Sequence, residues 1–449
     1  MNVHELPTTG LKMECPFTWE LDLKLVLNFC KKERTITNDE ISPVMSFIDM
    51  NTFAYIRSMQ GKIVAAEELI EKINATWDNI YENVSEQKVY SIDVLMHIKD
   101  ATAYYIYSMI GKKDKAKEME SKIKDANNFK SDIEKGTIVG SRAIASGLFY
   151  EKSVDTCIKL AKQASSYSPN CALWHYFTAK CLRIKRRYDN FSAMVSEEEK
   201  NAFLKCYELS QSLDYRICIA RMYKESKNWK KCSEIFNEIY LQKPTRQKVR
   251  LILALSFINS KDFSKAKDCL DYIESTVPPE KRSKTYYHYL AKYYEANKDY
   301  PKAKENYKIA TLQADNFPAD IDYLNLIRKT DSKNNYNVIK HLKSMIEKYK
   351  DKESFVLQMY LDLATIYLFQ NKNLKLAADY FLMAIKMDPC HPQLENFQLP
   401  WKHKTKYNIF ELISKEILTE NENNYGNTLK ELKNYCIEYK KRVENNVLD

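Results

Sequence analysis

The chain has 449 residues, of which only 7 are glycine and 12 are proline. A β-sandwich, a β-barrel or a Gly-rich nucleotide-binding fold needs more turn-forming residues than this, so an all-α fold is expected. The 70 Lys and Arg against 60 Asp and Glu give a net charge of +10, which permits an anionic partner without requiring one.

Targeting and redox signals are sparse. No run of about 18 apolar residues is present, and the first ten residues lack the basic-then-apolar order of a signal peptide. The 11 cysteines are scattered without a Cys-x-x-Cys pair and fall mostly at apolar helix positions. We therefore expect a cytoplasmic protein in a reducing compartment, with no membrane segment.

In chain order, the first motif lies at residues 15–21, which read Cys-Pro-Phe-Thr-Trp-Glu-Leu (the Phe-Thr-Trp box). Weaker repeat-like helical pairs then begin near residues 53, 103, 145 and 174. A polar stretch at residues 187–200 interrupts the last of these pairs.

The strongest repeats lie between residues 219 and 389. Each has a large residue beside a small one, an aromatic residue three positions later, and then a second run with small and large apolar residues. The frame begins at Ile219-Ala220, Leu253-Ala254, Leu290-Ala291 and Leu363-Ala364. The first two starts are 34 residues apart, which is the period of tetratricopeptide repeats (TPR).

These patterns predict an all-α TPR helical-hairpin superhelix (solenoid). We expect about eight hairpins over residues 1–400, with the Phe-Thr-Trp box at the start and an insertion near residues 187–200. Residues 318–356 form one degenerate hairpin, and residues 401–449 form a charged C-terminal helical segment. An irregular helical bundle is the alternative, which four in-register repeats disfavour.

In a TPR the first helix of each hairpin lines the concave face. Counting groove positions from the repeat starts selects basic and aromatic residues, with Asp214 and Glu295 as acidic exceptions. Lys and Arg neutralise phosphates, and Tyr and His stack on unpaired bases. The selected residues are Arg142, Tyr150, His175, Arg183, Arg221, Lys224, Lys248, His288 and Lys292.

Two of these positions also allow structural roles. Tyr150 is one of 32 tyrosines, so packing competes with base stacking as its role. Arg183 and Arg186 lie in a basic run over residues 180–187, which is either a solvated helix face or a phosphate contact.

The Phe-Thr-Trp box resembles the Cys-x-Phe-Thr-Trp-x-Leu signature of the interferon-induced proteins with tetratricopeptide repeats (IFIT proteins). Residues 51–56, 134–136 and 221–229 are similar to further stretches of that family, and the resemblance covers about residues 13–390. It implies a cytosolic antiviral effector of innate immunity. Such an effector would hold and sequester the triphosphorylated or capped 5′ end of single-stranded RNA in a basic tunnel.

The resemblance also implies individual site residues. The family's tunnel tyrosine falls on Tyr150 and its tunnel arginine on Arg183, while Arg142 is the nearest basic residue to its lysine. Of the family's Thr…Gln pair, a threonine is kept, for which we take Thr37, but the glutamine is absent. Its His-Gln pair falls on Leu251 and Ile252, so preference for a triphosphate or a cap stays open.

No motif of a catalytic site is found, so we expect no enzyme, no cofactor and no metal; the adjacent Cys390 and His391 lack four-ligand spacing. Three hypotheses remain. The protein binds RNA 5′ ends, or it is a TPR adaptor that binds acidic peptides or protein partners, or it kept the scaffold and lost RNA binding. A homo-oligomer or association with related TPR proteins is compatible with each of them.

Overall fold

The helices of this protein pair into antiparallel hairpins, as the repeat pattern predicts. The computed structural model describes residues 10–29, 42–189, 193–312, 316–331, 336–350, 353–399, 406–418 and 426–445. The chain forms two compact units, Met1–Lys243 and Pro244–Asp449, which are described separately below.

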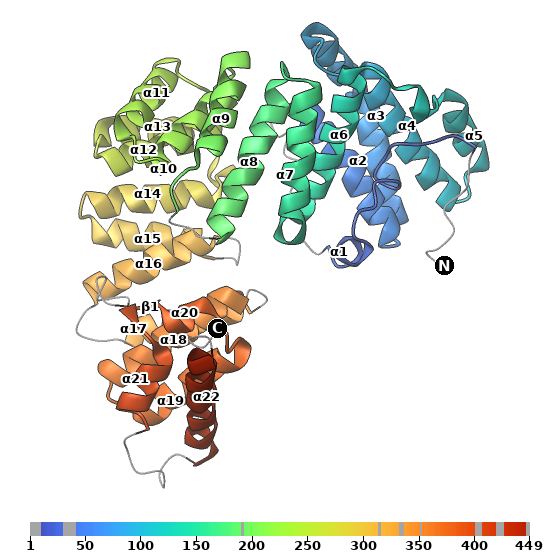
Figure 1. Ribbon diagram of the computed structural model, residues 1–449. Helices are drawn as coiled ribbons and strands as arrows, with labels where there is room; N and C mark the ends of the chain where they lie inside the picture. The colour runs from blue at the N-terminus through green and yellow to red at the C-terminus, as the bar shows by residue number, and fades with distance from the viewer. Residues whose placement is uncertain are drawn as a thin grey trace. The chain divides into compact units, whose positions relative to one another are not determined.

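The first unit consists of helices α1 to α11 and two short 3-10 helices (Figure 1). Consecutive helices from α2 to α11 pack in pairs and form five hairpins within the described residues. The helices are α1 (Leu23–Leu27), α2 (Pro43–Met59), α3 (Ile63–Gln87), α4 (Ile92–Met109), α5 (Lys113–Lys122), η1 (Ala126–Asn128), α6 (Asp132–Ser146), η2 (Gly147–Phe149), α7 (Tyr150–Tyr167), α8 (Ala172–Asp189), α9 (Glu197–Leu209), α10 (Leu213–Glu225) and α11 (Trp229–Leu241).

The Phe-Thr-Trp box packs onto the first two hairpins. The Phe17 ring stacks on Tyr105, with centroids 4.9 Å apart, and meets Tyr55 edge-on at 4.8 Å. The Thr18 hydroxyl donates to the Met13 carbonyl at 2.9 Å and accepts from the Cys15 amide. The box is thus a folded cap over the apolar ends of α2 and α4 in the described structure.

Helix α6 approaches its neighbours closely because it carries two glycines. A Cβ at Gly140 would lie 2.5 Å from the buried Trp174 ring, and one at Gly136 would lie 2.3 Å from the Ser168 hydroxyl. The residues before these glycines begin the helix, because Ser131 and Glu134 form a capping box. Residues 134–136 therefore combine a helix start with close helix packing.

The segment between α8 and α9 is shorter than the predicted insertion. Helix α8 continues to Asp189 and α9 begins at Glu197 with Ser196 as its N-cap. The polar residues after Arg186 belong partly to α8, because Lys and Arg are good helix formers and their charges face solvent or acidic partners. The predicted interruption at residues 187–200 is therefore too long.

The second unit consists of helices α12 to α22, one 3-10 helix and a short antiparallel strand pair, Phe397 opposite Tyr407 (Figure 1). Its elements are α12 (Gln247–Ser260), α13 (Phe263–Thr276), η3 (Pro279–Lys281), α14 (Lys284–Ala296), α15 (Tyr300–Ala310), α16 (Phe317–Thr330), α17 (Tyr336–Lys348), α18 (Glu353–Phe369), α19 (Leu374–Met387), α20 (Pro392–Glu395), β1 (Phe397–Gln398), β2 (Lys406–Tyr407), α21 (Ile409–Glu416) and α22 (Gly426–Asn445).

Helices α12 to α19 form four hairpins whose cores contain the predicted repeat residues. Ala291, Ala303, Tyr307 and Ala310 are completely buried. Small residues let the paired helices approach, while Tyr307 fills the space between hairpins and stacks on Tyr323. With the five hairpins of the first unit, the described residues form nine hairpins, which confirms the all-α TPR solenoid fold.

The C-terminal helices are part of the core of the second unit. Helix α22 packs against α19 and α21, and its Leu432 is completely buried. Ile409 and Ile413 of α21 are also completely buried. Residues 406–418 and 426–445 are thus integrated into this unit, whereas the sequence pattern predicts a separate charged segment over residues 401–449.

Lysines close several turns between paired helices and account for the low glycine content. Gly61 and Gly111 have φ values of 74° and 75°, but Lys227, Lys261 and Lys298 take the same left-handed conformation at equivalent turns. An L-residue in this conformation costs about 1 kcal/mol relative to glycine. The hairpin packing therefore offsets a local strain at each of these lysines.

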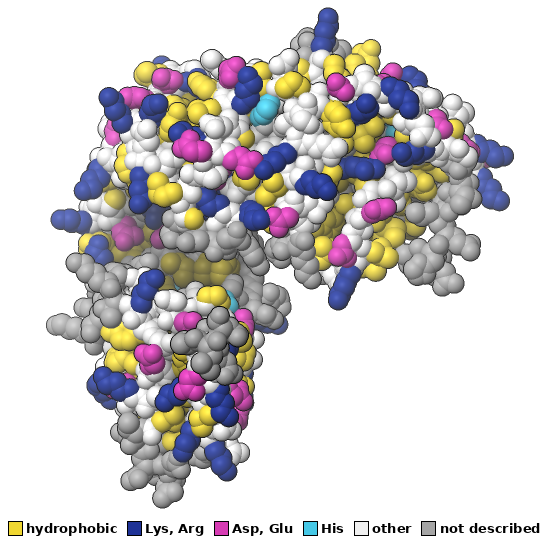
Figure 2. Space-filling model, viewed as in Figure 1, with side chains coloured by type: hydrophobic (Ala, Val, Ile, Leu, Met, Phe, Trp, Pro, Cys, Tyr) yellow, Lys and Arg dark blue, Asp and Glu magenta, His cyan; other side chains and the backbone are white. Residues whose placement is uncertain are grey.

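On the face shown in Figure 2, Lys and Arg side chains lie scattered among Asp and Glu. Within the described residues, no helix is long and apolar enough to cross a membrane, and no group of His, Cys, Asp and Glu could hold a metal ion.

Candidate functional site

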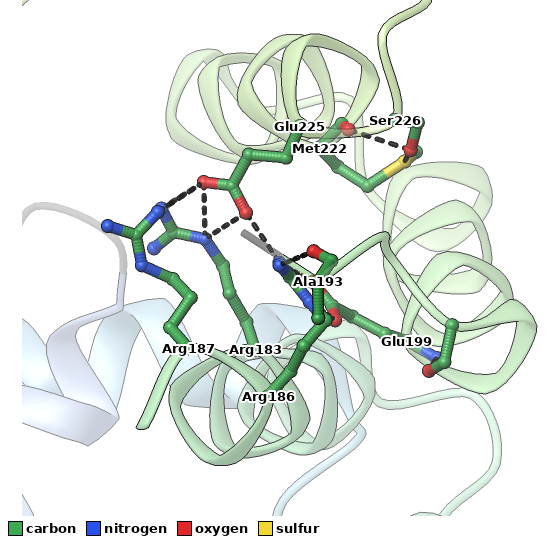
Figure 3. Close-up of polar contacts among 9 residues, drawn as sticks. Arg183, Arg186, Arg187, Ala193, Glu199, Met222, Glu225 and Ser226 are labelled. Atoms are coloured by element: carbon green, nitrogen blue, oxygen red, sulfur yellow. Dashed lines mark hydrogen bonds and ion pairs between the residues drawn. The ribbon is translucent and has the colours of Figure 1, made fainter. Parts of the chain in front are cut away.

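Three arginines of α8 converge on one carboxylate of α10. Arg183, Arg186 and Arg187 are spaced i, i+3 and i+4, which places them on one face of the helix. All three point towards Glu225 at the end of α10 (Figure 3). We call these residues, together with Glu199, the arginine cluster.

Arg183 and Glu225 form a bidentate ion pair. The Arg183 Nε lies 3.0 Å from Oε1 and 3.1 Å from Oε2 of Glu225, and its Nη2 also donates to Oε1. The Arg187 Nη1 lies 3.2 Å from the same Oε1. One carboxylate therefore accepts hydrogen bonds from several guanidinium groups, which are planar donors suited to carboxylate and phosphate oxygens.

Arg186 is held from a second side. Its Nε donates to Glu199 Oε2 at 2.8 Å, and its Nη1 donates to the Ala193 carbonyl at 2.7 Å (Figure 3). Glu199 is completely buried in the first turn of α9, where the helix N-terminus also stabilises its charge. Arg186 therefore has a fixed position between α9 and α10.

The protonation states follow from these contacts. Burial raises the pKa of Glu225, but the hydrogen bonds from Arg183 and Arg186 and the charges of Arg183 and Arg187 outweigh it, so the pKa is lowered. The hydrogen bond to Glu199 raises the pKa of Arg186. Burial and the neighbouring Arg183 charge lower the pKa of Arg187. Glu225 is therefore ionised near pH 7.

Further cations surround the cluster. Burial raises the pKa of the Cys218 thiol on α10, and the charges of Arg221, Arg183 and Lys180 act against this rise while Asp214 adds to it. These charges therefore lie close to one thiol. Arg221 is exposed and forms no ion pair with the part of the chain that the structure describes, and Lys224 is half-buried. The cluster with its surroundings carries a net positive charge.

Arg142, on α6, has an acidic partner in the Phe-Thr-Trp box. Its Nη2 lies 2.8 Å from Glu14 Oε2, to which the Trp19 indole also donates at 3.0 Å. Glu14 is buried, and its amide donates to Nε2 of His97 at 2.8 Å. Arg142 thus joins the box to α6, and its role in ligand binding stays a prediction.

The remaining predicted residues of the first unit differ in what surrounds them. His175 donates from Nε2 to the Pro169 carbonyl at 2.8 Å, and burial lowers the pKa of its imidazole, so the ring is neutral near pH 7. Tyr150 begins α7, but its side chain lies outside the described part of the structure. Thr37 lies outside the described residues.

In the second unit, one carboxylate holds two predicted cations. Asp322 Oδ2 lies 2.8 Å from both the His288 Nε2 and the Lys292 Nζ. Burial raises the pKa of Asp322, but the hydrogen bond from His288 and the charge of Lys292 outweigh burial. The pKa of Asp322 is therefore lowered. Lys248 is exposed on α12.

The structure thus brings Arg183 and Arg186 together on α8, and the charges of Arg183 and Arg221 both act on the Cys218 thiol of α10. Sequence reasoning missed the acidic partners Glu225, Glu199 and Asp322. Glu225 could have been selected from the sequence. It lies one helical turn after Arg221, on a helix that the repeat frame predicts to line the groove.

The fold and the site define an all-α TPR array with a partly neutralised arginine cluster. It is similar to the structure of human IFIT1 as a dimer with m7Gppp-AAAA, at 14% identity and a TM-score of 0.59, over 98% of each chain. The identity, the TM-score and the covered shares are the same for the human IFIT1 dimer with PPP-AAAA. For a monomeric mutant of IFIT1 with Gppp-AAAA the identity is 14% and the TM-score is 0.60, over 95% of this chain and 98% of the IFIT1 chain. The protein therefore has an IFIT-like fold.

No protein-family model matches the chain. No curated protein sequence matches it significantly.

Proposed function

We propose that this protein binds the 5′ end of single-stranded RNA through the arginine cluster and sequesters it, as a cytosolic effector of antiviral innate immunity. The observation that carries the proposal is the arginine cluster: three guanidinium groups of α8 surround one anionic group. Planar guanidinium pairs recognise phosphate oxygens as they do a carboxylate.

The surroundings support a polyanionic ligand. Arg221, Lys224 and Lys180 extend the positive charge along α8 and α10, and several successive RNA phosphates need such a row of cations. The IFIT-like fold adds support, because two of the IFIT1 structures contain capped and triphosphorylated RNA ends. The ligand of this chain would then displace Glu225 from the arginines.

The test is binding of the full chain to single-stranded RNA oligonucleotides with triphosphate, capped, monophosphate or hydroxyl 5′ ends, measured by fluorescence anisotropy over a salt series. We expect the logarithm of affinity to fall with the logarithm of salt by about 0.7 per phosphate contact. Arg183→Glu should weaken binding at least tenfold, because it removes a cation and adds an anion next to phosphate.

Lys159→Glu is the matched control. Lys159 is exposed on α7 and lies outside the arginine cluster, so this charge reversal should leave RNA affinity close to that of the unmodified chain. Equal RNA binding by Arg183→Glu and the unmodified chain would refute the proposal.

One observation favours the adaptor function as the second candidate. The group that the arginines hold in this structure is a carboxylate, and an acidic peptide presents the same group. Binding of a poly-glutamate peptide, lost in Arg183→Glu, together with no binding of any RNA, would favour this function.

A further inference from the structure

A second cationic site lies in the second unit, between α15, α16 and α17. A cavity of about 470 Å³ opens there, a volume within the range of small-molecule sites. The residues that line it are Lys304, Lys308, Tyr323, Ile327, Asp331, Asn337, Lys340, His341 and Ser344.

The charges of this cavity are not balanced. Lys304 pairs with Asp331 at 2.9 Å, and Asn337 donates to the same carboxylate at 2.9 Å. Lys308 and Lys340 are exposed, and neither forms an ion pair with another described residue. Two ammonium groups, one from α15 and one from α17, therefore remain for an anion that enters the cavity.

The inner wall is fixed. The Tyr323 ring stacks on Tyr307 with centroids 5.9 Å apart and meets the His341 ring edge-on at 5.1 Å. His341 in turn donates from Nε2 to the Asp320 carbonyl at 3.2 Å. Because the Nε2 proton is used there, Nδ1 is the acceptor of the neutral ring. The packing holds these two rings in place without a ligand.

Apolar surface lies beside the cations. Tyr323 is half-buried, and Ile327 from the next turn of α16 lines the same cavity. Ile327 is only 5% exposed, so Tyr323 offers most of this surface, and a phosphate alone would use the two lysines and leave the exposed part of Tyr323 in water. A ligand that joins a phosphate to a flat ring would use both, since aromatic rings pack on tyrosine.

We propose that this cavity binds a small phosphorylated ligand with a planar ring, of the class of nucleoside mono- and diphosphates. The phosphate lies between Lys308 and Lys340, and the ring packs against Tyr323 and Ile327. The site uses none of the residues of the arginine cluster, so the proposal is independent of RNA binding.

The experiment is isothermal titration calorimetry of the full chain with ADP, AMP, adenosine and pyrophosphate as probes. We expect ADP to bind more tightly than both adenosine, which lacks phosphate, and pyrophosphate, which lacks the ring. The double variant Lys308→Ala/Lys340→Ala should lose at least tenfold in ADP affinity, because both phosphate partners are removed.

Lys343→Ala is the matched control, because Lys343 is also exposed on α17 but does not line the cavity. It should bind ADP like the unmodified chain, as should Arg183→Glu. Circular dichroism melting of each variant checks that the fold is kept. No ADP binding by the unmodified chain, or equal losses in the double variant and Lys343→Ala, would overturn the proposal. Equal affinities for ADP and pyrophosphate would overturn the ring contact.

Discussion

Glu225→Gln tests whether the arginine cluster is blocked by its own carboxylate. The substitution keeps the size of the side chain and removes one negative charge. The pKa of Glu225 is lowered, so this charge is present near pH 7. If an RNA phosphate replaces Glu225 as the partner of Arg183, the variant should bind RNA more tightly than the unmodified chain.

The magnitude follows from Coulomb's law. A unit charge removed at about 5 Å from a phosphate is worth about 0.8 kcal/mol in water and about 3.3 kcal/mol at an effective dielectric constant of about 20. The Arg183 and Arg187 side chains are 33% and 31% exposed, which places the site nearer to the first limit. We expect triphosphorylated RNA to bind roughly 5- to 20-fold more tightly, or about 1–2 kcal/mol.

Stability should change in the opposite direction. The neutral amide weakens the hydrogen bonds that Arg183, Arg186 and Arg187 make to this position, and loss of such charged hydrogen bonds costs about 1–3 kcal/mol. The melting temperature should therefore fall while the RNA affinity rises. Glu238→Gln is the control, because Glu238 pairs with Arg216 at 2.8 Å and lies outside the cluster.

Fluorescence anisotropy with triphosphorylated RNA and melting by circular dichroism are measured on both variants. RNA affinity of Glu225→Gln at or below that of the unmodified chain, with the expected loss of melting temperature, would refute competition between Glu225 and RNA.

Three further predictions concern the fold. Gly140→Ala should destabilise the first unit by about 1–3 kcal/mol in urea unfolding, because its Cβ would lie 2.5 Å from the Trp174 ring; a change below about 0.5 kcal/mol would contradict this. Lys261→Gly should raise the free energy of unfolding by about 0.5–1 kcal/mol, because residue 261 has a φ of 63°; a decrease would show that its side chain stabilises the turn. Iodoacetamide at mildly alkaline pH should label the exposed Cys390 in the native protein but not Cys15, because burial raises the pKa of Cys15 to about 12; mass spectrometry of the labelled peptides decides.

The repeat frame could be predicted from the sequence because its signals are local. Ala291, Ala303 and Tyr307 recur at fixed spacings, and each is completely buried as a TPR requires. The low glycine content correctly indicated helices. It did not reveal that lysines such as Lys261 take the left-handed turn positions, because many residues can occupy that conformation at a moderate cost.

The division at Lys243 and Pro244 could not be predicted, because repeats on either side of it keep the same frame. The division depends on the contacts within each unit, and a single sequence does not specify these contacts.

The candidate site was predicted as a set of mostly basic and aromatic residues without their acidic partners. Arg183 was selected by groove position and Arg186 as part of the basic run over residues 180–187, yet their partner Glu225 lies 42 and 39 residues further along the chain. Arg142 and Glu14 are 128 residues apart. Pairings of this kind depend on the rotamers of long side chains and on the angle between helices, and neither has a period in the sequence.

The acidic partners determine what the proposed RNA site would select. Glu225 already pairs with Arg183, Arg186 and Arg187. A ligand must therefore bind these arginines more strongly than a single carboxylate does. A neutral 5′ hydroxyl offers no charge there, whereas a terminal phosphate carries a charge of about −1.5 to −2 at pH 7 and has three acceptor oxygens. In the proposed complex, the internal carboxylate therefore opposes weak anions more than strong ones. The modest net charge of +10 fits this arrangement, because selection comes from local competition between anions and not from a large positive field over the whole chain.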